Sequence, residues 1–258
     1  MKTLASRYGV LPLCFLLLFF SCTKTNEVTY SLPSSADDFT DNRLVSLSQF
    51  APGDSLVLRG DTSMGDETAM VQTAFKDNNV NNFVSFTALA EYLSGNGGID
   101  RSLMKFSLRG FADSGTNAAS KIQKAVLYLY QYHRPADNDP YTNPQTDDNS
   151  AELHRVVSHW DANTVTWNTQ PKLAKNSADS LQDVIIIPAV VTPLPRGTND
   201  NQALDVTAML KRMLRSGVNE GFMLKLSATG EAGFDQGRAY GSFACPIVAR
   251  RPRLVIYF

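Results

Sequence analysis

The sequence is poor in cysteine, histidine and tryptophan: its 258 residues include three cysteines, three histidines and two tryptophans. It also has no excess of one charge, because 24 basic residues stand against 25 acidic ones. Nucleic-acid binding calls for a concentrated basic surface, so this balance indicates no nucleic-acid partner. The motifs G-x-S-x-G, H-E-x-x-H and the phosphate-binding glycine loop are missing as well. These absences favour a binding or structural protein over an enzyme.

The apolar run near the N-terminus is too short to span a bilayer. The basic residues Lys2 and Arg7 precede the run, which comprises residues 10–20 and is followed by Ser21-Cys22. Such an arrangement is the lipoprotein type of secretory signal. We expect residues 1–21 to be removed and Cys22 to be acylated, and several acyl chains anchor a protein stably. An ordinary signal peptide followed by an incidental cysteine is the alternative.

The exported chain would have no intrachain disulfide. Cys14 leaves with the signal and Cys22 carries the lipid, so Cys245 is alone and we expect it to be a small buried residue. Residues 22–42 are polar, which predicts a flexible tether between the membrane and the domain. Residues 43–258 are long enough for one large β-domain with its own core.

Short alternating segments separated by Gly, Pro and Asn turns dominate that domain. Residues 122–132 carry the strongest strand signal, with aliphatic side chains on one face and tyrosines on the other. The aliphatic face comprises Ala125, Leu127 and Leu129. Further strands are predicted at residues 55–59, 68–75, 102–108, 183–187, 221–227 and 253–258, whereas residues 83–93 fit either a strand or a short helix.

Residues 203–215 change to a helical period. Met209, Leu210, Met213 and Leu214 recur at helical spacing. Thr207 is the predicted N-cap, and Gly217 lies beyond the end. Many short strands with little helix predict an all-β protein, a jelly-roll-like β-sandwich with one short helix.

Residues 152–171 contain both tryptophans. The pattern predicts a strand, a polar turn at residues 161–163 and a second strand at residues 164–167, with Pro171 ending it. Two indoles that flank one turn, Trp160 and Trp167, would anchor the strand ends in the core. Sugar stacking by these rings is the alternative.

Several pieces of sequence occur together in a recognisable order. They are R-S-L-M-K-F-S-L (residues 101–108), I-Q-K-A-V-L-Y-L-Y (122–130), T-V-T-W-N-x-x-P after Trp160 (164–171), L-D-V-T (204–207), G-F-M-L (221–224) and R-P-R-L (251–254) with Ile256 and Tyr257. In this order they resemble the DNRLRE-domain family, β-sandwich modules similar to carbohydrate-binding module family 96. The resemblance covers residue 55 to the C-terminus and departs in the N-terminal third, at His159 and at residues 161–163. It implies a jelly-roll-like sandwich that binds glycans and accompanies polysaccharide-degrading systems.

The tyrosine face of residues 122–132 is the predicted carbohydrate-binding surface. Tyr128, Tyr130 and Tyr132 alternate, so their rings lie on one side of the sheet, where they could stack on sugars. Arg134 and Tyr141, in the polar loop that follows, could add hydrogen bonds. In the alternative, loops cover these rings as part of the core and the polar loop is merely solvated.

No metal site or cofactor is predicted. The Asp- and Asn-rich turns lack the spacing of a calcium-binding EF-hand, although a structural calcium ion is left open. His154 and His159 have no third ligand for zinc in view.

The sequence therefore predicts non-catalytic polysaccharide binding by a lipid-anchored outer-membrane protein. Its periplasmic or cell-surface side is not specified. The expected partners are a polysaccharide, the membrane through Cys22, and lipoproteins or enzymes of a glycan-uptake system. A structural or adhesion module that binds protein partners and a polysaccharide-degrading enzyme are the two rival functions.

Overall fold

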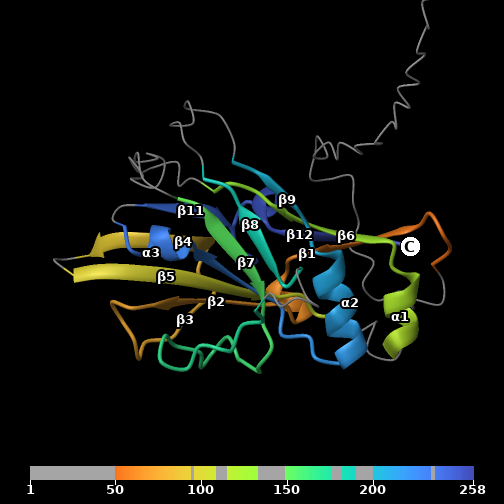
Figure 1. The fold of residues 1–258 in the computed structure, drawn as a ribbon, viewed down its shortest axis with the longest axis horizontal. Coiled ribbons are helices and arrows are strands. Elements are labelled where there is room, and N and C mark those ends of the chain that lie inside the picture. The colour runs from red at the N-terminus through yellow and green to blue at the C-terminus, as the bar shows by residue number, and fades with distance from the viewer. Residues whose placement is uncertain are drawn as a thin grey trace, which may run out of the picture. The chain divides into compact units, whose positions relative to one another are not determined.

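The computed structural model describes residues 50–93, 96–108, 115–132, 149–175, 182–189, 200–233 and 236–258. These residues form two antiparallel β-sheets and a few short helices (Figure 1), which confirms the predicted all-β sandwich. The predicted signal, tether and Cys22 lie outside the described residues. No helix among the described residues is both long and apolar enough to cross a membrane.

The smaller sheet has the strand order β1-β12-β6-β9. Its strands are β1 (Ser55–Arg59), β12 (Arg253–Tyr257), β6 (Lys124–Leu129) and β9 (Gln202–Asp205). Ala125, Leu127 and Leu129 of β6 point into the core, as their alternation predicts.

The larger sheet has the strand order β11-β4-β5-β10-β7-β8. These strands are β11 (Gln236–Gly241), β4 (Ser85–Leu93), β5 (Asn96–Lys105), β10 (Phe222–Leu226), β7 (Ala151–Arg155) and β8 (Val184–Ile187). β2 (Glu67–Gln72) also pairs with β5, and β3 (Val80–Asn81) pairs with β2. The ambiguous residues 83–93 are therefore mostly strand.

Strand β8 is less buried than its apolar sequence predicts. It lies at the end of the larger sheet and pairs with β7 alone among the described strands. Ile187 is fully buried, but Ile186 is 60% exposed. A continuous apolar run predicts burial on both faces, and here the outer face is open at this residue.

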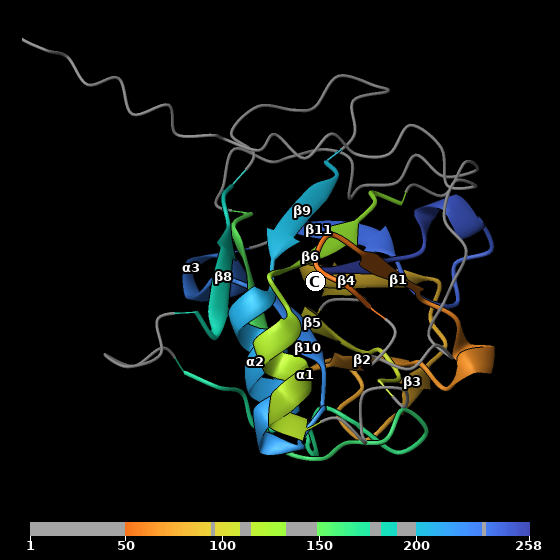
Figure 2. The same ribbon diagram turned by 90° about the vertical axis from the view of Figure 1, so that its right-hand side faces the viewer.

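The helices are α1 (Gly115–Lys121), α2 (Thr207–Ser216) and α3 (Ala228–Glu231). α1 and α2 lie side by side (Figure 2). α2 is the predicted helix, and its four apolar residues at helical spacing are all buried. The prediction of only one helix is wrong, since the short α1 and α3 were missed. Thr207 is not the N-cap: the helix begins there after Val206, and the Thr207 hydroxyl instead accepts a hydrogen bond from the Ala125 N–H at 2.8 Å.

The main core lies between the two sheets. Its largest fully buried side chains include Phe86 on β4, Phe222 on β10 and Tyr240 on β11. Each such aromatic side chain stabilises the fold by about 2–3 kcal/mol through removal of apolar surface from water. Gly221, just before β10, has φ +69°, and a Cβ there would lie 2.0 Å from the Met104 carbonyl oxygen. The G-F-M-L motif therefore begins with glycine for steric reasons.

Candidate functional site

The predicted tyrosine surface is buried. Tyr128, Tyr130 and Tyr132 are 3%, 6% and 7% exposed. Tyr128 and Tyr130 cluster with Val57, Val126 and Val255 on the smaller sheet.

The Arg253 guanidinium lies 4.8 Å from the centre of the Tyr130 ring and also hydrogen-bonds the Tyr130 hydroxyl. The prediction of an open tyrosine platform is thus wrong, and the covered arrangement is the one observed. Alternation determined the face of each ring but not what lies over it. The other two predicted binding residues, Arg134 and Tyr141, lie outside the described residues.

The outer face of the larger sheet is partly covered by the segment that carries both tryptophans. Trp160, Ala162 and Val165 pack on strand residues of β2, β5 and β10. Those strand residues are Ala69, Val71, Leu103 and Met223. The Trp160 indole N–H also donates to the Glu220 carbonyl at 2.8 Å, so its predicted role as a core anchor is confirmed.

The predicted second strand at residues 164–167 is wrong. The backbone forms turns there, and the N–H groups of Thr164 and Val165 donate to the Asp161 carbonyl oxygen. The Asn79 side-chain amide holds the segment by donating to the carbonyls of Ala162 and Val165, at 2.9 and 2.7 Å. These partners satisfy the backbone without a sheet ladder.

Next to this covered part lies a group of charged side chains that we call the charged row. It consists of Arg101 on β5, Lys225 on β10, Glu152 and His154 on β7, and Glu231 on α3. Lys225 is directly opposite Glu152 in the antiparallel pairing. Their neighbours Leu224 and Leu153 are in the core, so strand alternation sends the charged side chains outward.

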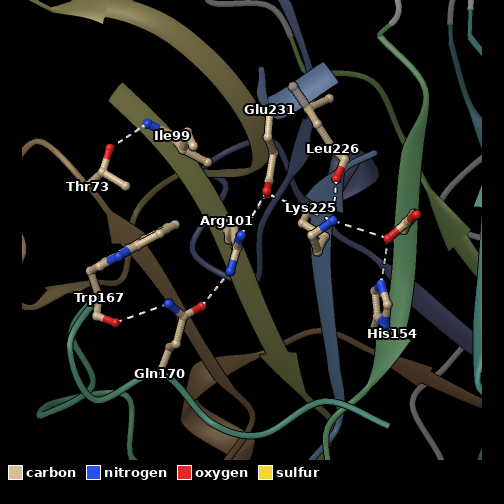
Figure 3. Close-up of polar contacts among 10 residues, drawn as sticks. Thr73, Ile99, Arg101, His154, Trp167, Gln170, Lys225, Leu226 and Glu231 are labelled. Atoms are coloured by element: carbon tan, nitrogen blue, oxygen red, sulfur yellow. Dashed lines mark hydrogen bonds and ion pairs between the residues drawn. The ribbon is translucent and has the colours of Figure 1, made fainter. Parts of the chain in front are cut away.

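Arg101 connects its strand, β5, to Glu231 of α3 and to the turn segment that carries Trp167 and Gln170 (Figure 3). Its Nε and Nη2 donate to the two Glu231 carboxylate oxygens at 2.7 and 2.8 Å, and its Nη1 donates to Gln170 Oε1 at 2.9 Å. The guanidinium carbon lies 4.6 Å from the centre of the Trp167 ring. Such a planar two-bond contact with stacking holds the indole in one orientation.

The other end of the charged row is a chain of contacts through Glu152. Lys225 Nζ lies 3.1 Å and His154 Nε2 lies 2.8 Å from Glu152 Oε2. Partial burial acts to raise the pKa of Glu152, but these two hydrogen bonds and the Lys225 charge outweigh it, so the pKa is lowered. Glu152 is therefore an ionised acceptor at neutral pH.

Trp167 borders the charged row through Arg101, and Phe75 lies in a loop that is bonded to the loop of Trp167. Trp167 is half-buried, and Phe75, in the loop after β2, is 51% exposed. Asn168 connects the two loops, since its N–H donates to the Lys76 carbonyl and its side-chain amide donates to Asp77 Oδ1 at 2.8 Å. Aromatic planes beside fixed hydrogen-bonding groups are the combination that sugars require.

The family model of carbohydrate-binding module family 96 matches residues 66–237. The chain belongs to this family. The matched range includes every element of the charged row and runs from just before β2 into β11. No curated protein matches the chain.

As a family 96 module the protein binds carbohydrate, and the charged row offers it several polar groups. Sequence reasoning had assigned Arg101 only to a structural strand motif and had missed Phe75 and Gln170. One available signal was Phe75 itself, an aromatic residue directly before the polar run Lys76-Asp77-Asn78-Asn79. A large apolar ring in a turn has no core to enter and is a candidate for ligand contact.

Within the described residues, no group of three or more His, Cys, Asp or Glu side chains could hold a metal ion. His154 contacts Glu152, and the exposed His159 contacts Glu220 at 3.1 Å. The two histidines thus lie in separate ion-pair groups.

Proposed function

We propose that this protein is a non-catalytic, lipid-anchored polysaccharide-binding protein of the outer membrane, and that the glycan binds along the charged row beside Trp167 and Phe75. The observation that carries the proposal is the Trp167 ring. It is half-buried and stacked on the Arg101 guanidinium. Gln170, which accepts a hydrogen bond from Arg101, donates its amide to the Trp167 carbonyl at 3.1 Å. An aromatic ring held in this way can accept a sugar face without losing rotamer freedom.

The mechanism is capture of a sugar chain. The apolar faces of sugar rings would stack on Phe75 and Trp167, while sugar hydroxyls would donate to Glu152 or Glu231. Each contact is weak, and many anchored copies acting on one polysaccharide raise the overall affinity.

The charges of the site support binding without cleavage. Hydrolysis of a glycosidic bond needs one carboxyl group that keeps its proton near neutral pH. The pKa of Glu152 is shifted in the opposite direction, and Glu231 is held by two hydrogen bonds from Arg101. Glu152 is therefore not suited to act as a general acid. An enzyme in the same chain would release reducing sugar from a polysaccharide panel, and we expect no release.

Anchoring through Cys22 predicts a specific labelling result. In cells fed an alkyne fatty acid, the wild-type protein should be labelled and should sediment with the outer membrane. Cys22→Ala should lose both properties, because acyl transfer needs the thiol of that residue. Labelling retained in Cys22→Ala would contradict the lipoprotein assignment. Protease treatment of intact cells would then distinguish the periplasmic from the cell-surface side.

The binding proposal is tested with Phe75→Ala and Trp167→Ala. We expect each to weaken binding to a polysaccharide that the wild type binds by about fivefold, because a stacked ring contributes about 1 kcal/mol. Affinity gels or calorimetry give the measurement, and circular dichroism checks the fold. Phe75→Ala is the cleaner variant since its ring is half-exposed.

Ile247→Ala, which removes an exposed apolar side chain before the 3₁₀ turn Val248–Arg250, is the matched control and should bind normally. Unchanged binding in both aromatic variants would exclude this site. Failure of the wild type to bind any polysaccharide would favour a structural or adhesion module that contacts proteins.

A further inference from the structure

The backbone of Trp167 is held by the turn in which it lies. The Thr169 N–H donates to the Thr166 carbonyl at 3.2 Å, and the Thr166 N–H donates to Thr169 Oγ1 at 2.9 Å. The side-chain amide of Gln170 donates to the Trp167 carbonyl at 3.1 Å. These bonds fix the main chain, so the direction of the ring depends on the two side-chain torsions of Trp167.

The Trp167 ring packs against the apolar cluster around Trp160, and its centre lies 4.6 Å from the Arg101 guanidinium carbon. Arg101 on β5 is paired with Val71 on β2. Since Val71 belongs to the outer cluster, Arg101 also points to the outer face of the sheet. An unrestrained arginine side chain samples many rotamers and would support a ring poorly. The order of the ring therefore depends on what holds Arg101.

The Arg101 guanidinium is held by three hydrogen bonds. The Glu231 carboxylate accepts two of them, at 2.7 and 2.8 Å, and Gln170 Oε1 accepts the third at 2.9 Å. The side chains of Arg101 and Glu231 are only 18% and 13% exposed, so water competes little for these bonds. Ser227, the N-cap of α3, fixes the start of that helix, because its N–H donates to the Ser150 carbonyl at 2.9 Å. The plane of the guanidinium is thereby set.

We infer that Arg101 is a positioning residue for carbohydrate binding, which acts on the sugar through the Trp167 ring and is itself held by Glu231 and Gln170. The inference rests on the proposed function, in which Trp167 stacks on the sugar. A ring that becomes ordered only when the ligand arrives lowers the affinity, and prior ordering by Arg101 avoids that cost. The role requires arginine, because lysine has neither the plane that stacks on an indole nor the fork that bonds two partners.

A double-mutant cycle on a polysaccharide that the wild type binds tests the inference. We expect Arg101→Ala to weaken binding about fivefold when Trp167 is present. In the Trp167→Ala background it should weaken binding by less than about twofold, because positioning has no effect once the ring is gone. Equal weakening in the two backgrounds would overturn the inference, since Arg101 would then contact the sugar itself.

Arg101→Lys separates positioning from charge. It keeps a cation beside Glu231 but loses the planar contact with Trp167 and the bond to Gln170. It should weaken binding nearly as much as Arg101→Ala. Binding at the wild-type level by Arg101→Lys would overturn the inference, because a positive charge alone would then be sufficient.

Time-resolved fluorescence anisotropy measures the motion of the ring without any glycan. Trp160 is 3% exposed and its N–H is bonded to the Glu220 carbonyl, so a fast component reports on Trp167. Both Arg101 variants should show a larger fast component than the wild type. An unchanged decay in Arg101→Ala would overturn the inference.

Lys105→Met is the matched control. Lys105 Nζ lies 4.9 Å from the centre of the other indole, Trp160, which is buried. This variant should keep the wild-type affinity and anisotropy decay, and circular dichroism checks its fold and that of the other variants. Weakening as large as that of Arg101→Ala would overturn the inference, because loss of any cation on this face would then be the cause.

The outcomes separate this inference from the proposed function. If Trp167→Ala weakens binding but Arg101→Ala acts equally with and without the ring, the binding site stands and only the positioning role is overturned. If Trp167→Ala binds as the wild type does, or the wild type binds no polysaccharide, the proposed function fails and the inference fails with it.

Discussion

Replacing Arg238 with alanine is expected to lower the free energy of unfolding by about 3–5 kcal/mol, because it leaves buried acceptors without their cation. Arg238 is on β11 and is almost fully buried. Its Nη1 lies 2.6 Å from Asp200 Oδ2, its Nε donates to the Asn149 carbonyl at 3.0 Å, and its Nη2 donates to the Pro188 carbonyl. One side chain thus joins β11 to the ends of β7, β8 and β9.

Urea unfolding followed by tryptophan fluorescence measures the loss. Arg215→Ala is the control, since Arg215 is exposed in the last turn of α2, and it should cost less than about 0.5 kcal/mol. Asp200→Asn should be intermediate, because an amide keeps an oxygen that can accept from Arg238 and from the Tyr240 hydroxyl. If Arg238→Ala and Arg215→Ala unfold at the same urea concentration, the contacts of Arg238 do not stabilise the fold.

Replacing Asp100 with asparagine is expected to reduce the stability that the protein loses as the pH rises from about 4 to about 7. Asp100 is on β5 where β2 and β4 both pair with that strand, and it is 2% exposed. Its Oδ2 accepts from Gln72 Nε2 at 3.1 Å, whereas its Oδ1 has no hydrogen-bond partner among the described residues. Burial raises the pKa of Asp100 to about 7, the Gln72 hydrogen bond opposes the shift, and the charge of Glu91 adds to it.

The sign of the effect follows from the raised pKa. The unfolded chain releases this proton near pH 3.8, while the folded protein keeps it up to about pH 7. The stabilising contribution of the neutral carboxyl is complete below pH 3.8 and is lost as the pH rises through 7. A shift of this size corresponds to about 4 kcal/mol.

Asparagine is neutral throughout this range. The difference in unfolding free energy between Asp100→Asn and the wild type should therefore move in favour of the variant by about 4 kcal/mol from pH 4 to pH 8. Urea unfolding at the two pH values measures it, with Asp54→Asn as the control for loss of one exposed carboxylate. A difference that stays constant between the two pH values would show that Asp100 is already ionised in the folded state.

Much of the fold could be predicted from local patterns. Alternation located β1, β6, β10 and β12 to within a few residues, and helical spacing located α2, because side-chain direction repeats every two residues in a strand and every 3.6 residues in a helix. The turns at residues 164–167 could not be predicted in this way. β-branched and aromatic residues fit a strand, but here Asn79, more than 80 positions away, bonds the backbone carbonyls instead.

The sequence by itself determined the sandwich, the family and the outward or inward direction of most strand residues, since these depend on local periodicity and on short motifs. Only the tertiary structure decided which outward side chains are covered and which meet in the charged row. Arg253 lies on Tyr130 across 123 positions, and Arg101 meets Glu231 across 130 positions. Contacts between residues so distant in the chain arise only when the strands have assembled, and no local period encodes them.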